Sequence, residues 1–492
     1  MKQLNLLCIF LFTISIVANS QNEGSAFTLT GMGVSTPFAR DYQALGINVA
    51  NLDMTSKFED KSVTLGFAEI GLSLYSEVLT KPELRQNLFR EDIKEFNMEQ
   101  QRDYALAFAN SDNAIDLDAM AFGISLRTEN LGTFAFSTRE KVNFYSRLGN
   151  QVSDIVWLGY NASYFDSLIV DYGNGNIDTI PNSEDIDPET LQHVQQGITA
   201  LQNAKSLTEL LQGTKFGFGW YREFSLGWGK RLLSTENLEL HGGLAAKLLV
   251  GHGMLDVTAE NDKATAFSAL SPIFGIEYGS ISDENPSSLD SNARPLQPVG
   301  LGYGFDLGAT IVYKQKFIFN LAINDIGKIT WDGNLYKLND TQITNFKNPG
   351  LESVDFIGQI NQLNGSDGLV SWLGEQKRTT SLPTTVRAGF GFDNNKSIKA
   401  GIDFVAPLSD DLGNMQTIAI ALGGEYSPTP WLHLQAGYTQ GGNYGSKIPI
   451  GIYFTVGQGT YEFGAASRDL VTFFRDNEPT ISAAIGFLRF RF

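Results

Sequence analysis

The feature of this sequence that most restricts its fold is a strict alternation of apolar and polar residues over segments of about ten residues. The segment 299–313 shows it clearly. Leu301, Tyr303, Phe305 and Leu307 occupy alternate positions there, with glycine or Asp306 between them. Successive side chains of a strand point to opposite faces, so this period of two indicates strands with one apolar and one polar face. The same pattern recurs in 417–426, 431–439 and 448–456.

Strands of this kind occur in soluble sandwiches, where the apolar face meets another sheet, and in membrane barrels, where it meets lipid. The connections distinguish the two. Short connections, such as 314–316 and 394–396, alternate along the chain with long ones, such as 258–298. Outer-membrane barrels alternate tight periplasmic turns with long outer loops. The sequence therefore predicts an all-β transmembrane antiparallel barrel of about 14 strands (12 to 16 would fit) with long outer loops.

An even number of strands returns both ends of the chain to the periplasmic side. The predicted strands are 63–75, 117–127, 131–145, 214–231, 238–257, 299–313, 317–331, 384–393, 397–406, 417–427, 431–440, 448–457, 460–466 and 480–492. A phase switch in the first strand predicts a bulge at Ala68-Glu69. Arg222 falls on an otherwise apolar row, so a register break or an interface position must accommodate it. Residues 266–278 also resemble a strand and are placed in an outer hairpin.

The two ends of the chain indicate export. Residues 1–20 have a positive start, an apolar core and the cleavage-site pattern Ala18-Asn19-Ser20, which predicts a secretory signal peptide. The sole cysteine, Cys8, lies within it. Residues 21–60 precede the first strand and are too apolar for a dangling tail, so they are predicted to form a plug, and 61–492 the barrel. The terminal Phe492 resembles the C-terminal strand signal that outer-membrane assembly machinery recognises.

Nothing in the sequence indicates catalysis. The chain has 4 histidines and no zinc, Walker or nucleophile-elbow motif, so we expect no enzyme, no metal and no cofactor. A Ser-His-acid cluster within hydrogen-bond reach would reverse that expectation. The net charge of −18 makes binding to nucleic acid improbable. Two outer segments read as helical: 187–213, which begins with the cap Asp187-Pro188, and 84–108.

Seven charged or ionisable side chains are predicted to face the lumen from neighbouring late strands. They are Arg387, Lys399, Asp403, Glu425, His433, Arg489 and Arg491. Two interpretations remain open. These groups pair with one another and fill the interior, or the basic ones bind an anionic head group, since a fixed cation in a low-dielectric lumen favours a carboxylate.

Three sequence stretches resemble a known family. Residues 43–52, which contain Asn48, Ala50 and Asn51, are similar to the Asn-Pro-Ala hatch segment of barrels like the long-chain fatty acid transporter, with Val49 in place of the proline. Leu382-Pro383-Thr384-Thr385 with Arg387-Ala388-Gly389, and then Ala400–Phe404, resemble the late hairpin of such barrels in Bacteroidetes-type bacteria. Gly302–Gly308 is similar to an uncharacterised branch.

The resemblance implies a barrel of 14 strands whose lumen is blocked by an N-terminal hatch that includes Asn48, Ala50 and Asn51. It also implies that hydrophobic or amphipathic small molecules, such as fatty acids, enter from the outer loops and leave through the wall. The expected partners are outer-membrane lipid, the assembly machinery and a hydrophobic ligand. Other barrels of this shape serve type IX secretion, so the alternative is a scaffold that binds a protein partner and transports nothing.

Overall fold

A computed structural model describes most of the chain after the predicted signal peptide. The described residues are 26–54, 61–78, 97–183, 185–260, 263–274, 294–338, 342–351, 370–409, 415, 417–442, 445–471 and 480–492. The predicted signal peptide and the limits of the predicted plug at 20/21 and 60/61 lie outside them. No helix among the described residues is long and apolar enough to span a membrane.

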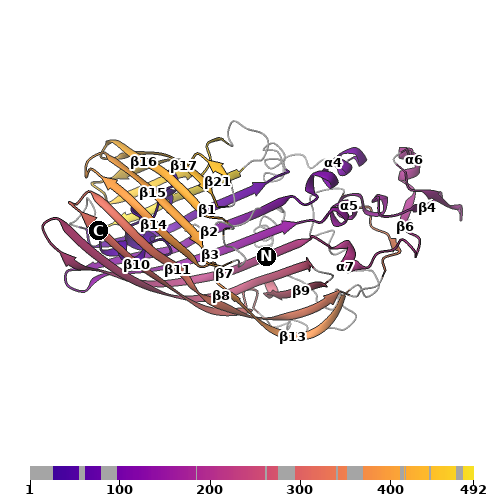
Figure 1. Cartoon of the computed structure of the whole chain (residues 1–492), viewed down its shortest axis with the longest axis horizontal. Helices are drawn as coiled ribbons and strands as arrows, with labels where there is room; N and C mark the ends of the chain where they lie inside the picture. Colours follow the sequence, from indigo (N-terminus) through magenta and orange to yellow (C-terminus); the bar gives the residue numbers. More distant parts are fainter. Residues whose placement is uncertain are drawn as a thin grey trace.

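The main sheet closes into an antiparallel barrel of 14 strands (Figure 1). In order around the wall they are β1 (Val63–Ser76), β2 (Asp112–Thr128), β3 (Gly132–Arg147), β7 (Lys215–Ser234), β8 (Leu238–Glu260), β10 (Gly300–Tyr313), β11 (Phe317–Leu338), β14 (Thr385–Asp393), β15 (Ile398–Pro407), β16 (Ala419–Thr429), β17 (Leu432–Gly441), β19 (Ile450–Val456), β20 (Tyr461–Ser467) and β21 (Thr480–Arg491). Closure occurs where β1 pairs with β21, for example Leu65 with Phe490. The predicted fold class and strand count are therefore confirmed.

The alternation places apolar side chains outside and polar ones inside. Along β10, Leu301 and Leu307 are exposed (61% and 51%), whereas Asp306 and Thr310 are completely buried. The exposed row continues on β16 with Ile420 and Leu422. A closed barrel with an outward apolar row is the architecture of outer-membrane proteins, because lipid covers the row and no strand edge is left unpaired within the membrane.

Local irregularities fall where the sequence predicted them. Ala68 adopts a left-handed φ of 51° and is left out of the pairing between β1 and β2, which agrees with the predicted bulge. A register shift also occurs at Trp220/Tyr221, and Arg222 beyond it pairs with Glu140 at 2.5 Å between Nε and Oε1. The row of β7 thus tolerates a cation because a carboxylate on β3 neutralises it.

The N-terminal residues 26–54 form the plug inside the barrel. They contain α2 (Phe27–Thr30) and two 3₁₀-helices, η1 (Asp41–Ala44) and η2 (Val49–Asp53). Wall glycines make room for this segment. A Cβ on Gly423 would lie 1.8 Å from the carbonyl oxygen of Met32, and Met32 is itself fully buried. Glycine on the inner face of β16 is therefore what lets the plug backbone touch the wall.

Beyond the membrane part, several strands continue outward. β8 and β11 extend there together with β9 (Lys263–Leu270) and β13 (Val370–Ser381), and α4 (Met98–Phe108), α5 (Asn150–Leu158) and α7 (Leu207–Leu210) lie at the same end (Figure 1). The predicted strands 317–331 and 384–393 leave 332–383 as a long loop, and this prediction is wrong for β13. Strands that meet water on both faces lose the apolar alternation, so 370–381 gave no strand signal.

The predicted helix over 187–213 is also wrong. Only α6 (Pro188–Leu191) and α7 are helical there, and Val194–Ile198 forms strand β6. β6 joins a separate four-stranded outer sheet with β12 (Asn345–Phe346), β4 (Ser167–Asp171) and β5 (Ile177–Pro181). Pairing with β4 buries Val194 and overrides the helical spacing. Of the second predicted helix, 97–108 is described and contains α4, whereas 84–96 lies outside the described residues.

Candidate ligand site between the plug and the barrel wall

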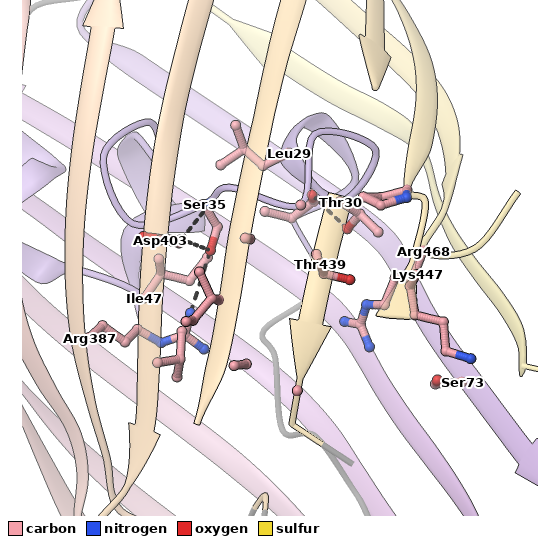
Figure 2. A pocket seen from close by; sticks show the side chains of 18 residues that line it. Leu29, Thr30, Ser35, Ile47, Ser73, Arg387, Asp403, Thr439, Lys447 and Arg468 are labelled. Carbon is pink, nitrogen blue, oxygen red and sulfur yellow. Dashed lines mark hydrogen bonds between the residues drawn. The ribbon is translucent and has the colours of Figure 1, made fainter. Parts of the chain in front are cut away.

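A cavity lies between the plug and the strands β14 to β18 (Figure 2), where β18 is Ser446–Lys447. It encloses about 50 Å³ of space and opens into a wider hollow that is continuous with solvent. Its apolar lining comes from Leu29 and Ile47 of the plug and Val405 of the wall. Its charged lining residues are Arg387, Asp403, Lys447 and Arg468. In the view of Figure 2, Arg387 and Asp403 lie at one side, and Lys447 and Arg468 at the other.

Arg387 is the unusual residue of this cavity. Its side chain is almost fully buried (2% exposed), yet its Nε has no hydrogen-bond partner, and Nη1 donates only a long bond of 3.4 Å to Ser35 Oγ. The register explains this, because the residues directly opposite Arg387 are Val405 on β15 and Ala322 on β11. A buried cation with incomplete hydrogen bonding is costly unless an anion complements it. The cavity in front of Arg387 can admit such an anion.

Asp403 hydrogen-bonds to the backbone of the plug and forms no ion pair with an arginine among the described residues. Its Oδ2 accepts the backbone N–H groups of Ser35 (2.8 Å) and Thr36 (2.9 Å), and its Oδ1 has no hydrogen-bond partner. Gly389 stands opposite Asp403 in the register. A Cβ on Gly389 would lie 2.9 Å from Cδ of Pro37, so the turn 35–37 rests directly on the wall here.

Lys399, Glu425 and His433 form a second group, which is saturated with partners. Lys399 stands directly opposite Glu425 and donates from Nζ to Oε1 at 2.9 Å. Oε2 of Glu425 accepts from Tyr453 Oη (2.9 Å) and Gln435 Nε2 (3.0 Å). Lys399 therefore lies on the inner face, as predicted, and Glu425 neutralises its charge.

The same group contains a Ser-His-acid arrangement that the sequence analysis set as a criterion for catalysis. Ser427 Oγ lies 2.9 Å from His433 Nδ1, and Glu425 Oε1 lies 3.4 Å from that same nitrogen. In a hydrolase relay, the nucleophile and the carboxylate contact opposite ring nitrogens. Here the other nitrogen contacts Thr455 Oγ1 at 3.0 Å, and Thr455 is buried. Ser427, His433 and Glu425 lie within hydrogen-bond distance, but Ser427 and Glu425 contact the same ring nitrogen, so this arrangement is not that of a hydrolase relay. The absence of catalysis stays a prediction.

Arg489 and Arg491 form a third group with two carboxylates. Arg489 contacts Glu462 and Asp41, each at 2.5 Å, and Arg491 contacts Glu462 at 2.5 Å. Asp41 belongs to η1, so this group fastens the plug to β20 and β21. The seven predicted lumen residues thus divide into three clusters: only Arg387 and Asp403 line the cavity, and the others form ion pairs and hydrogen bonds within the wall or to the plug.

The predicted hatch residues form a network of amides. Asn48 caps η2 by accepting the N–H of Ala50 at 3.2 Å. The Oδ1 of Asn51 accepts from Thr310 (2.7 Å) and Asn320 (3.0 Å) of the wall. Val49, which stands at the family's proline position, is the first residue of η2 and is completely buried. The hatch segment therefore closes the lumen by side-chain hydrogen bonds to β10 and β11.

Other plug and wall residues were missed by sequence reasoning. Tyr42 Oη donates to Glu69 at 2.5 Å, and burial followed by this nearby carboxylate raises the pKa of Tyr42 well above its usual value. Lys247 pairs with Asp306 (2.9 Å) and Asp325 (2.6 Å). The alternation of β8 and β10 places Lys247 and Asp306 on the inner face, so the sequence contained a signal for these two residues. It contained none for the contacts of Ser35 and Thr36, because the plug has no regular alternation of apolar and polar residues.

Fold and site together define a class: a plugged outer-membrane β-barrel with a partly apolar cavity beside the plug. Residues 186–466 match the model of a family described as a family of unknown function (DUF5723), and the chain belongs to that family. A search of curated proteins finds no significant match.

Solved structures with a similar course include three named barrels. The toluene transporter TodX of Pseudomonas putida has 11% identity, covers 96% of this chain and 99% of its own, and gives a TM-score of 0.42. The toluene transporter TbuX of Ralstonia pickettii has 11% identity, covers 96% of this chain and 99% of its own, and gives a TM-score of 0.44. A FadL homologue of Pseudomonas aeruginosa has 12% identity, covers 96% of this chain and 97% of its own, and gives a TM-score of 0.38.

Proposed function

We propose that this barrel passes hydrophobic or amphipathic small molecules, such as fatty acids, across the outer membrane. The observation that carries the proposal is the buried Arg387, which faces a partly apolar cavity without a full set of hydrogen-bond partners. Leu29, Ile47 and Val405 give the cavity an apolar side, where each buried methylene of a ligand contributes about 0.8 kcal/mol. The site therefore suits a molecule with an apolar tail and an anionic head.

The plug determines the kind of passage. It fills the lumen with buried apolar residues such as Val34 and Leu45, so the closed state is no general aqueous pore. A ligand in the cavity touches the plug directly, since Leu29, Ser35 and Ile47 line it. Passage then requires part of the plug to move, and the hydrogen bonds of Asn51 and Asp403 are the contacts that such movement breaks.

The experiment that tests this function compares substitutions of two cationic side chains that face the lumen. Arg387→Gln removes the unsaturated cation, whereas Lys399→Gln removes one that Glu425 already neutralises. Each folded barrel is reconstituted into liposomes. Uptake of radiolabelled laurate is expected to be at least about tenfold lower with Arg387→Gln than with the unaltered barrel. Lys399→Gln is the matched control and is expected to retain uptake within about twofold of the unaltered barrel.

The alternative is a scaffold that binds a protein partner through its outer loops. One feature favours it: the stretch 148–204, which includes most of the four-stranded outer sheet, contains no lysine or arginine and eight acidic residues. If liposomes with the unaltered barrel take up laurate no faster than protein-free liposomes, transport of fatty acids is wrong and the scaffold function replaces it.

Export and assembly are part of the same proposal. Residues 1–20 direct the chain out of the cytoplasm and are removed, and the end of β21 is recognised by the outer-membrane assembly machinery. The alternation that supports this recognition is present in the structure, because Leu488 and Phe492 are exposed to the lipid side while Arg489 is buried inside. Phe492→Ala is expected to lower the amount of assembled barrel in outer-membrane fractions.

A further inference from the structure

Strand β5 is an edge of the four-stranded outer sheet. The order of this sheet is β12-β6-β4-β5, so among the described residues β5 has a neighbouring strand on one side only. That neighbour is β4, which pairs with β5 along its whole length. Four of the five residues of β5 are exposed. In Figure 1, β4 and β6 lie at the end of the molecule farthest from the barrel, so this edge is accessible from outside the membrane.

The register of the pair shows which backbone groups β5 presents on its free side. In an antiparallel pair, residues alternate between those whose N–H and C=O groups face the neighbouring strand and those whose groups face away from it. The N–H of Asn182, just after β5, donates to the C=O of Asp166 at 3.0 Å, so the even-numbered residues of β5 face β4. Ile177 and Thr179 therefore present their backbone groups on the free side.

Asp178 restricts which strands can pair with this edge. Its Oδ1 accepts the N–H of Thr179 at 2.7 Å, so the carboxylate occupies the donor that an added strand needs. A short edge strand with a charged side chain is one way in which proteins prevent indiscriminate pairing. A basic side chain on an incoming strand attracts this carboxylate and releases the N–H of Thr179 to the carbonyl of that strand. An acidic strand is repelled instead.

We propose that β5 is a docking edge for an extended segment of a partner protein in which lysine or arginine alternates with apolar residues. The partner's backbone pairs with Ile177 and Thr179, and this main-chain pairing supplies the affinity. Successive side chains point to opposite faces, so a basic side chain meets Asp178 and an apolar one packs on Ile177, which is 63% exposed. The surroundings favour the same charge, because the stretch 148–204 contains eight acidic residues and no lysine or arginine.

Docking at β5 goes beyond the proposed passage of small molecules and does not depend on it. No residue of β5 lines the cavity between plug and wall, and none belongs to the plug. The full-length barrel in detergent is therefore a suitable material for a binding test, with or without a transported ligand.

The test measures, by fluorescence anisotropy, how tightly short synthetic peptides bind to the folded barrel. The probe alternates lysine with valine. One comparison peptide has glutamate in place of lysine, and the other has the probe sequence with methyl groups on its backbone nitrogens, which keeps the charge and removes the donors. We expect the probe to bind at least about tenfold more tightly than either comparison peptide. We also expect the bound probe to slow amide exchange at Ile177 and Thr179 at least about tenfold.

Two variants locate the binding. Thr179→Pro removes the donor on the free side, and proline fits an edge position whose N–H faces away from the sheet, so we expect at least about tenfold weaker binding of the probe. Asp178→Lys replaces the attracting charge by a repelling one and is expected to weaken binding about tenfold. Asp185→Lys makes the same change of charge at another exposed position of the outer region. It is the matched control and is expected to stay within about threefold of the unaltered barrel.

Amide protection at Leu168, a buried residue of β4, verifies that the outer sheet is folded in each variant. If Thr179→Pro does not keep this sheet, the comparison of the probe with its methylated form still decides the inference. Equal binding of the probe and either comparison peptide, or equal binding of the probe by Asp178→Lys and the unaltered barrel, overturns it. Protection of Ile177 that rises with barrel concentration in the absence of probe assigns the edge to a second copy of this chain and also overturns it. Laurate uptake decides the proposed function alone, and its failure leaves the docking edge unaffected.

Discussion

At the residue scale, Asn51 is a plug side chain that hydrogen-bonds to two wall strands at once. It accepts from two wall side chains and donates from Nδ2 to the carbonyl of Thr36 at 2.8 Å, so it joins β10 and β11 to the turn beside Asp403. Asn51→Ala removes the acceptor of the Thr310 hydroxyl and the donor to the Thr36 carbonyl, at a cost of about 1–3 kcal/mol for each group, whereas Asn320 keeps its bond to Thr310. We expect hydrogen exchange in residues 32–52 to become at least about tenfold faster. Asn150→Ala, which alters an exposed contact in the outer region, is the control.

The residue scale also shows what alternation can and cannot predict. It placed Arg387, Lys399 and Arg491 inward, and none of them lies on the lipid side. It could not say which of them is neutralised, because that depends on strand register. Lys399 faces Glu425 across β15 and β16, whereas Arg387 faces Val405. A shift of two residues would keep every side chain on the same face and exchange these partners.

At the element scale, the outer sheet depends on one carboxylate at its corner. Asp166 Oδ2 accepts the N–H of Ala200 at 3.0 Å and the hydroxyl of Thr199 at 2.9 Å, and these bonds lower the pKa of Asp166 below its usual value. A depressed pKa means that the charged form stabilises the fold. This stabilisation is present above about pH 4 and is lost as the pH falls through the lowered pKa.

The expected outcome is a pH-dependent opening of this sheet alone. Amide protection at Ala200, corrected for the intrinsic exchange rate, is expected to fall between neutral pH and about pH 3. Asp166→Ala is expected to have low protection at every pH and no such decline. Barrel strands such as β17 provide an internal control, because the backbone of β17 pairs with the main chain of β16 and β19. Protection at Ala200 that is independent of pH in the unaltered chain would show that Asp166 does not anchor the corner.

The sequence did not reveal the four-stranded outer sheet or β13, the outward extension of the main sheet. β6 carries the apolar spacing of a helix, and β13 and β5 have polar residues on both faces. Alternation is a signal of two different environments, so it vanishes where water contacts both faces. Within the membrane part, lipid on one side and the plug on the other maintain that contrast, which is why the strands there were predicted to within a few residues.

At the scale of the whole molecule, a plug closes the barrel, and the proposed function requires this plug to move for a ligand to pass. Wall glycines let the plug lie against the inner surface, ion pairs between Asp41 and Arg489 fasten one end, and Asp403 holds the turn next to the cavity. All 14 strands can stay in place during passage, because the contacts to be broken are side-chain contacts rather than ladder hydrogen bonds.

A disulfide between plug and wall tests this claim most directly. A Cβ at Gly33 would lie 3.9 Å from the Cβ of Ala421, within the range that a disulfide requires. It would also lie 2.9 Å from side-chain atoms of Pro449 and Thr439, and Gly33 has a φ of 72°, so the Gly33→Cys single variant controls for the shift that the new side chain itself imposes. In a Cys8→Ser background, the Gly33→Cys/Ala421→Cys barrel can be oxidised, and each single variant and the reduced double variant serve as controls. We expect oxidation to lower laurate uptake by liposomes at least about tenfold and reduction to restore it. Equal uptake by the oxidised and reduced barrels would contradict it.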